Sequence, residues 1–201
     1  MPKKKTLRKK DIKDKKDKKD KKDIKDKKDK KVTILIVYES DRPTLKSLAK
    51  KVYNGASSIK GVNVKMKTIN KVKNNELIKY DAVIVGSPVY NANPSPKVID
   101  FMYRWPHDSG NMNNKIGATF VTAGGISAGE ELVQINIIQA MMIFGMIIVG
   151  GSDWQSPFGA SKIIEELDLK KESKHFDLKA FNLGVRVATI TKNLGENYQE
   201  T

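Results

Sequence analysis

The chain has 201 residues with no cysteine, only two histidines and a formal net charge of +15. Without cysteine, disulfides, thiolate catalysis, cysteine-bound zinc and iron–sulfur clusters are excluded. Two histidines also disfavour a histidine-rich metal centre, so no metal site is predicted. No apolar run is long enough to span a bilayer, and the charged N-terminus carries no secretory signal. We therefore expect a cytoplasmic protein without a transmembrane segment.

The positive charge is concentrated in a Lys-Lys-Asp repeat at the start of the chain. Residues 1–31 hold 18 Lys and Arg against 7 Asp, which is +11 of the total, whereas residues 32–201 carry only +4. The repeat has almost no apolar side chains whose burial would offset the entropy of ordering. We expect a disordered tail over 1–31 and one domain over 32–201. A weakly and non-specifically bound anionic partner is one role for the tail; a solvated, solubilising extension is the favoured alternative.

The first half of the domain alternates between strand and helix patterns. An apolar run at 32–38 predicts a strand, and a helix is expected over 45–55. Residues 62–69 alternate apolar and polar side chains, as in an edge strand with one solvated face. A β-branched run at 82–86 predicts a buried strand that stops at Gly86-Ser87-Pro88. A helical pattern follows Pro96.

The second half continues the same alternation. A strand is expected at 116–122, followed by a long helix over 130–144 that ends at Gly145. Another strand is predicted at 146–150, and a closing helix at 177–194. Five strands alternating with four or five helices indicate an α/β fold with a parallel sheet and right-handed crossovers.

Ligands bind to open α/β sheets at loops that follow the carboxyl ends of the strands. The loop after 82–86 carries one aromatic residue, Tyr90, on a backbone stiffened by prolines, which suits a flat ring system. Taken alone, this segment is better explained as an ordinary strand-to-helix turn with a surface tyrosine. Gly124-Gly125 is in the same position after another strand, where a backbone approaches a ring closely or simply turns.

Several motifs follow one another in a recognisable order: residues 86–90, 96–97, 120–125, 129–131, 144–150 and 156–161. Together they resemble the flavodoxin-like superfamily and, within it, the NAD(P)H:quinone oxidoreductases of the WrbA type and NADPH-dependent FMN reductase-like proteins. The resemblance covers about 32–161. It implies a doubly wound, three-layer α/β/α fold whose five parallel strands follow the order 2-1-3-4-5.

The resemblance also implies FMN as the cofactor, held by three loops at the carboxyl edge of the sheet, and NAD(P)H as co-substrate. The implied FMN-binding residues are Ser40, Asp41, Arg42, Pro43, Thr44, Leu45, Ser87, Pro88, Val89, Tyr90, Asn91, Ala92, Thr122, Ala123, Gly124, Gly125 and Gly129. The ring is expected between Tyr90 and the 123–125 loop.

The first loop opens a helix, whose N-terminal N–H groups and dipole attract phosphate. The hydroxyls of Ser40 and Thr44 and the guanidinium of Arg42 would add hydrogen bonds. Pro43 stands where relatives usually have glycine and removes one N–H donor, although proline is tolerated in a first helical turn. A simple helix cap by Ser40 or Asp41 explains the same residues equally well.

The implied activity is hydride transfer from NAD(P)H through FMN to a quinone or similar small-molecule acceptor. WrbA-type enzymes commonly have His at the position of Phe144, near the reactive face of the flavin, and Tyr at that of Phe158. These departures concern substrate preference, because the flavin itself carries the hydride chemistry; no acid or base is assigned. Two alternatives are a flavodoxin-type one-electron carrier, which the mildly basic domain disfavours, and a flavodoxin-fold protein that no longer binds FMN.

Relatives of this type associate, which implies a homodimer or homotetramer. Residues 141–144 form an apolar helix end, and Trp154 and Phe158 lie in a loop after the last predicted strand. Clustered apolar surface of this kind favours a subunit contact, with the 152–161 loop near a neighbouring flavin. Packing of 141–144 under the sheet is the simpler explanation for part of this cluster.

Overall fold

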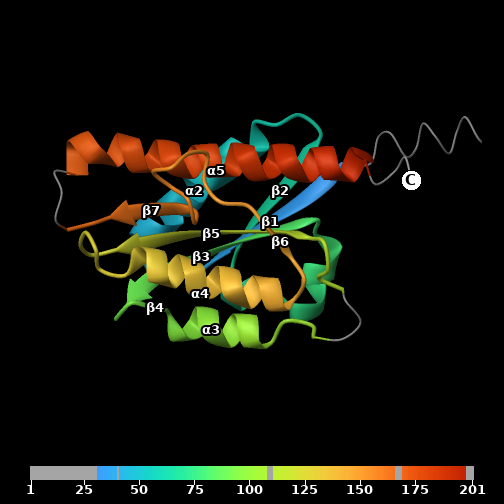
Figure 1. Cartoon of the computed structure of the whole chain (residues 1–201), viewed down its shortest axis with the longest axis horizontal. Coiled ribbons are helices and arrows are strands. Elements are labelled where there is room, and N and C mark those ends of the chain that lie inside the picture. The colour runs from blue at the N-terminus through green and yellow to red at the C-terminus, as the bar shows by residue number, and fades with distance from the viewer. Residues whose placement is uncertain (1–30, 40, 108–110, 166–168, 198–201) are drawn as a thin grey trace, which may run out of the picture.

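The computed structural model describes residues 31–39, 41–107, 111–165 and 169–197 (Figure 1). The prediction of a disordered tail falls on residues 1–30, which lie outside the described part, so it stays a prediction. Within the described residues, no helix combines the length and the apolar character needed to cross a membrane.

The central sheet has the predicted topology. Its main strands are β1 (Val32–Tyr38), β2 (Val62–Thr68), β3 (Ala82–Tyr90), β5 (Ile116–Ala123) and β6 (Ile147–Ile148). They are all parallel and follow the order β2-β1-β3-β5-β6, which confirms the predicted order 2-1-3-4-5. Two short strands raise the described total to seven: β4 (Asn93–Pro94), antiparallel to β3, and β7 (Ala160–Ile163), parallel to β5.

Two separate segments share the last position of the sheet. β6 pairs with the start of β5 and β7 with its end, so the chain leaves the sheet after β6 and returns at Ala160, with eleven residues between the two strands. The predicted strand at 146–150 is thus present as β6, but it is shorter than predicted. The reason lies in the backbone after β6: Gly151 donates its N–H to the Ser156 carbonyl (2.8 Å), which folds the loop back on itself. A Cβ on Gly150 would lie 2.0 Å from the Pro157 carbonyl oxygen, so only glycine fits there.

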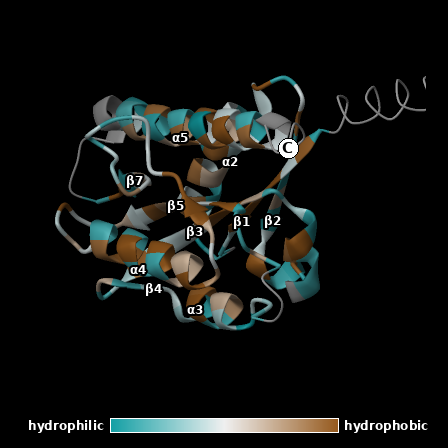
Figure 2. Cartoon of the chain, turned by 45° about the vertical axis from the view of Figure 1, so that its right-hand side comes forward, coloured by the Kyte–Doolittle hydropathy of each residue, from teal (hydrophilic) through white to brown (hydrophobic). Residues whose placement is uncertain are grey.

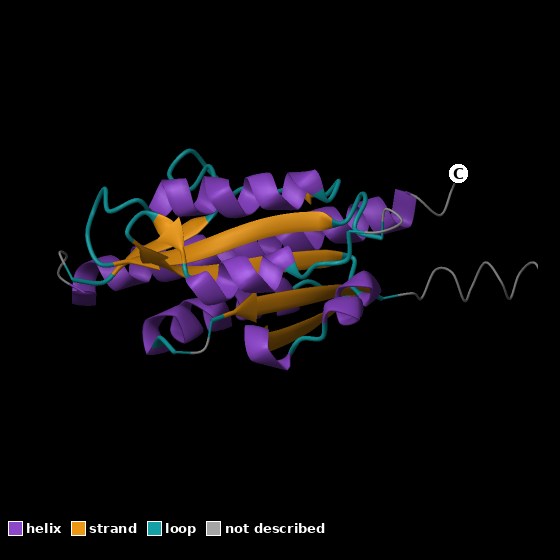
Figure 3. Cartoon of the chain, turned by 90° about the horizontal axis from the view of Figure 1, so that it is seen from below, coloured by secondary structure: helices purple, strands orange, loops and turns teal. Residues whose placement is uncertain are grey.

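Four α-helices cover the two faces of the sheet (Figures 1 and 3). They are α2 (Pro43–Ser57), α3 (Pro96–Tyr103), α4 (Glu130–Ile143) and α5 (Leu169–Asn197), with two short 3₁₀ helices, η1 (Ile69–Lys71) and η2 (Asn74–Lys79), between β2 and β3. Helices α2 and α5 lie on one face, and α3 and α4 on the other. This confirms the three-layer α/β/α architecture.

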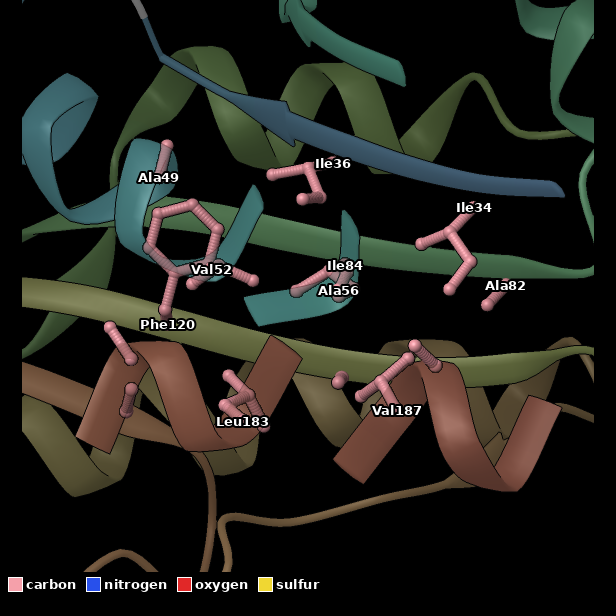
Figure 4. Packing of buried hydrophobic residues seen from close by; sticks show 14 of the residues in the cluster. Ile34, Ile36, Ala49, Val52, Ala56, Ala82, Ile84, Phe120, Leu183 and Val187 are labelled. Atoms are coloured by element: carbon pink, nitrogen blue, oxygen red, sulfur yellow. The ribbon is translucent and has the colours of Figure 1, made fainter. Parts of the chain in front are cut away.

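The alternation of side chains along the strands explains the two layers of helices. In β1, Ile34 and Ile36 pack with α2 and α5, whereas Leu35 and Val37 pack with α3 and α4. All four side chains are fully buried. Figure 4 shows the first of these clusters, in which Phe120 of β5 lies among residues of the strands and of α2. Strands buried on both faces read as continuous apolar runs, which is why the sequence predicted them well.

Helices α2 and α5 approach each other closely through two glycines. A Cβ on Gly55 of α2 would lie 1.9 Å from the Phe181 carbonyl oxygen of α5, and a Cβ on Gly184 of α5 would lie 2.1 Å from the Val52 carbonyl oxygen of α2. In both cases the obstacle is backbone rather than a flexible side chain. The two helices therefore cannot keep this separation if either glycine gains a side chain.

We expect Gly184→Ala to lower the free energy of unfolding by about 1–3 kcal/mol, because overpacking forces the two backbones apart. Urea denaturation measures this loss. Gly195→Ala is the matched control on the same helix: there the nearest atom is a side-chain carbon of Val32, 3.0 Å away, and helix propensity favours alanine. Equal stability of the two variants would contradict the close approach.

Candidate functional site

Three connections meet at the carboxyl edge of the sheet: 39–42, 91–95 and 124–129. Side chains join the first to the second, because Arg42 Nη2 donates to the Tyr90 hydroxyl at 3.0 Å and Lys97 pairs with Asp41. The second meets the third where Ala92 packs against Gly129. The structure thus brings the three predicted loops together within one chain.

The first connection opens α2 without a side-chain cap. Arg42 is the N-cap residue and Pro43 occupies the first turn, with no acidic residue in that turn. Capping by Asp41 is therefore wrong, and Ser40 lies outside the described residues. The N–H groups of Thr44 and Leu45 have no acceptor within the helix, so they are available to an anion. Leu45 offers only its backbone, because its side chain is fully buried in the core.

The charges around this helix end are evenly divided. Glu39 is only 3% exposed; its Oε2 has no hydrogen-bond partner, and its Oε1 lies 3.9 Å from Lys97 Nζ. Asp41 binds the same ammonium, and this hydrogen bond raises the pKa of Lys97. With Arg42, the site holds two cations and two carboxylates. A phosphate here would depend on the helix N–H groups, the Thr44 hydroxyl and Arg42 rather than on net positive charge.

The second predicted loop, Ser87 to Ala92, is largely strand. Ser87 and Pro88 extend the parallel pairing of β3 with β5, and Val89 and Tyr90 pair with β4. The strand prediction ended too early because Gly-Ser-Pro usually terminates a strand. The turn itself is only Asn91 and Ala92, both with positive φ (48° and 60°).

Buried hydrogen bonds fix the shape of this hairpin. The Ser87 hydroxyl donates to the Pro88 carbonyl (2.7 Å) and accepts from the Ser95 N–H (3.0 Å), while the Ser95 hydroxyl caps α3 by accepting from the Val98 N–H. Ser87 and Pro88 are buried, so they shape the loop from beneath. Val89 is half-buried against Ala123.

Tyr90 is the aromatic side chain that this hairpin presents to solvent. It is 37% exposed, and the Arg42 guanidinium carbon lies 5.5 Å from the centre of its ring. A cation at this distance attracts the aromatic face. A flat ligand would stack on Tyr90 either opposite Arg42 or in place of it.

The third connection follows two buried residues at the end of β5 and begins with an exposed glycine. Thr122 is 2% exposed and its Oγ1 has no hydrogen-bond partner, whereas Gly124 is exposed and its carbonyl accepts from the Glu165 N–H at 2.9 Å. Gly125 is half-buried. An unpartnered buried hydroxyl calls for a hydrogen-bonding group from outside the chain.

Gly129 has a structural reason to be glycine. Its φ is +96°, and a Cβ there would lie 2.6 Å from the Cβ of Ala92. Positive φ and close approach both exclude larger residues. Gly129 therefore allows the second and third connections to touch, and this contact sets the width of the site.

These residues fit a flavin mononucleotide. The helix end of α2 suits the phosphate, Tyr90 offers a ring face, and the Thr122 hydroxyl at the end of the neighbouring strand β5 lacks a partner. The fit is weaker at the phosphate than at the ring, because Glu39 and Asp41 are anionic and Pro43 has no N–H. When bound, FMN supplies hydride and electron transfer, and the protein supplies binding and orientation.

Phe144, by contrast, does not reach these loops within one chain. It caps the far end of α4, about 20 Å from Glu130 at 1.5 Å per residue. There it packs against Trp105 and His107, with ring centres 5.4 and 4.7 Å away. The expectation that this position lies near the flavin is thus not met by the chain's own site.

Comparison with known proteins agrees with this geometry. Residues 32–161 match the family described as NADPH-dependent FMN reductase. The chain belongs to this family. The match spans all three connections of the site, and it confirms the resemblance derived from the motifs.

Relatives of known name include flavodoxins and quinone reductases. A flavodoxin of Clostridium saccharobutylicum is 27% identical over 164 residues, 80% of this chain and 98% of the relative. A flavodoxin of Aquifex aeolicus is 28% identical over 60% of this chain and 66% of its own length. The NAD(P)H dehydrogenase (quinone) of Acidovorax ebreus is 27% identical over 58% of this chain and 69% of the relative.

Solved structures show the same fold. A flavodoxin from the domain Archaea has a TM-score of 0.64 and 25% identity over 80% of this chain and 99% of that chain. A WrbA-like flavodoxin from Agrobacterium tumefaciens has a TM-score of 0.65 and 19% identity over 81% and 98%. Family and relatives imply FMN, and NAD(P)H as co-substrate fits the dehydrogenase names, so both cofactor predictions are confirmed at the level of the family. The coarse activity, that of an FMN oxidoreductase, is supported in the same way.

Two site residues were missed by sequence reasoning. Glu39 and Lys97 form the ion-pair system around the helix end, yet neither was predicted to contact FMN. Lys97 stood within a recognised motif, so a signal was present. Glu39 gave none, because a single acidic residue after an apolar run usually lies in solvent.

We expect Tyr90→Ala to weaken FMN binding by about 1–3 kcal/mol, judged from aromatic stacking energies. Quenching of FMN fluorescence on titration measures the change. Tyr103→Ala, which removes an 80% exposed tyrosine from the end of α3, should leave the affinity unchanged. Unchanged affinity in Tyr90→Ala would remove this residue from the site.

Proposed function

We propose that the chain binds FMN at the carboxyl edge of its sheet and transfers hydride from NAD(P)H through the flavin to a quinone or similar small-molecule acceptor. One observation carries the proposal: a partly exposed Tyr90, an unpartnered Thr122 hydroxyl and an open helix N-terminus lie at the same edge. The family match adds the redox chemistry, and the quinone comes from the names of the dehydrogenase relatives.

Each connection has its own part in this proposal. The first turn of α2, with Thr44 and Arg42, holds the phosphate. Tyr90 and the 123–125 backbone hold the ring, and Thr122 donates to or accepts from its polar edge. Lys97 offsets part of the negative charge of Asp41 and Glu39, which weakens their repulsion of the phosphate. No side chain is assigned as acid or base, since hydride transfer itself requires none.

A flavodoxin-type electron carrier is the second candidate. The observation that favours it is size: the Clostridium flavodoxin is matched over 98% of its length, so the fold needs no further domain to act as a carrier. The two functions differ in one respect. A carrier is reduced by a partner protein, whereas the proposed enzyme oxidises NAD(P)H directly.

Two measurements on purified protein test the function. FMN added to the protein should give a bound flavin spectrum, and steady-state oxidation of NADH or NADPH should accelerate when a soluble quinone is supplied. Bound FMN without quinone-dependent NAD(P)H oxidation would favour the carrier. No FMN binding at all would leave a protein that has kept only the fold and would refute both candidates.

We further propose that the chain acts as a homodimer or homotetramer. Its α4 carries apolar side chains on its outer as well as its inner side: Val133, Ile137 and Met141 are buried, but Leu132, Met142 and Ile143 are 60%, 60% and 81% exposed. Figure 2 shows hydrophobic segments among hydrophilic ones along α4. Trp154 is 84% exposed in the loop between β6 and β7. The simpler explanation, packing under the sheet, accounts for Met141 but not for Met142, Ile143 or Trp154.

Met142→Glu is expected to convert the assembly to monomers, because a carboxylate in an apolar contact loses its hydration. Multi-angle light scattering at micromolar concentration reports the change in mass. Leu178→Glu, which alters an equally exposed leucine on α5, should leave the mass unchanged. A wild-type protein that is monomeric and fully active under these conditions would contradict the proposal.

A further inference from the structure

A second cavity lies at the edge strand β7 and shares only Ile126 with the three connections just described. Its volume is about 310 Å³. α4, α5, β7 and the loop before β7 line it, and Ile126 closes one side. No residue of the first or second connection contributes to its walls. This volume, at the lower end of ligand pockets, holds one small ring but no dinucleotide.

Two polar side chains of α4 point to a ligand in this cavity. Gln134 is only 3% exposed and its Nε2 has no hydrogen-bond partner; the Glu130 Oε2 is likewise buried and without a partner. Both residues line the cavity, and they are neighbours on one helix face because they are four positions apart. A buried donor next to a buried acceptor, both unsatisfied, is costly unless something else completes the hydrogen bonds.

The side chains that line the cavity indicate which kind of molecule completes the hydrogen bonds of Gln134 and Glu130. Ile126, Ile163 and Phe176 give apolar walls that suit a flat ring. The two carboxylates, Glu130 and Glu131, outnumber the one lysine of the lining, Lys179, which also donates to the Gln155 carbonyl at 2.8 Å; His175 is the remaining titratable residue there. A ligand carboxylate would be repelled by the two glutamates. An uncharged amide is accepted, because its carbonyl takes the Gln134 donor and its N–H satisfies Glu130.

We propose that this cavity binds a small flat molecule that carries an uncharged amide, such as an aromatic carboxamide. Gln134 Nε2 donates to the amide carbonyl, Glu130 Oε2 accepts from the amide nitrogen, and the ring lies against Phe176 and Ile163. The site is separate from the proposed FMN site and does not require FMN to be bound. It adjoins that site, however, because Ile163 and Phe176 pack against Ala123 at the end of β5.

Nicotinamide is the simplest probe, followed by ligand-observed NMR on the full chain with and without FMN. We expect saturable binding under both conditions. Benzoate has the same shape but a negative charge and no N–H, so it should bind at least about tenfold more weakly. Gln134→Leu should weaken nicotinamide at least about tenfold as well. The matched control, Gln139→Leu, changes an exposed glutamine on the same helix and should bind like wild type.

Ser161→Leu is a second variant that reduces the volume of the cavity and keeps Gln134 in place. It should also abolish binding, so the proposal can be tested even if Gln134→Leu does not fold. Absence of nicotinamide binding to wild type, or equal affinity of benzoate, would overturn the proposal. So would binding that is lost in Tyr90→Ala but kept in Gln134→Leu, since the probe would then occupy the flavin site. None of these outcomes depends on whether the protein binds FMN. A failure of this proposal can therefore be told apart from a failure of the proposed function.

Discussion

The fold depends on the contact between the Phe120 ring and the backbone of Gly86. A Cβ on Gly86 would lie 2.2 Å from Phe120 Cζ, so only glycine leaves room for the tip of the ring against β3. These residues are also partners in the parallel register, and Gly86 pairs with Tyr38 on its other side. The register of β1, β3 and β5 is thereby fixed at Tyr38, Gly86 and Phe120. Because the strands are aligned here, their following residues reach the same edge together, and the loops can form one site.

Side-chain contacts among two cations and two carboxylates hold the connections of the site together. Arg42 binds Tyr90, and Lys97 binds Asp41 beside the buried Glu39, so each anchoring contact joins two connections that are far apart in sequence. An exposed pair contributes little stability by itself. Here the contact between Arg42 and Tyr90 has a positional effect, because it fixes where the Tyr90 ring lies relative to α2. A phosphate entering this network would compete with Asp41 for cations, which makes binding sensitive to ionic strength.

Sequence patterns predicted the fold well where burial is two-sided and poorly where the backbone departs from regular pairing. The run at 32–38 was correct to the residue because both faces of β1 are covered. The strand predicted at 82–86 ended before the true end of β3 at Tyr90. The buried Ser87 hydroxyl donates to the neighbouring Pro88 carbonyl, and a pattern of residue types does not reveal this bond. The divided last strand depends on glycine contacts at Gly150 and Gly151. The cavity had no sequence signal, since Gln134 and Phe176 meet only through the tertiary packing.

Helix α4 takes part in the proposed flavin site, the second cavity and the exposed apolar surface. Its first residue follows Gly129, which packs against Ala92 in the proposed flavin site, and its first two turns carry Glu130 and Gln134 of the second cavity. Its outer side is the exposed apolar surface assigned to assembly. The proposed association of subunits on this outer side would leave the contact between Gly129 and Ala92 in place, because that contact is made within one chain. The loops of the proposed flavin site are thus arranged before a second copy packs against α4.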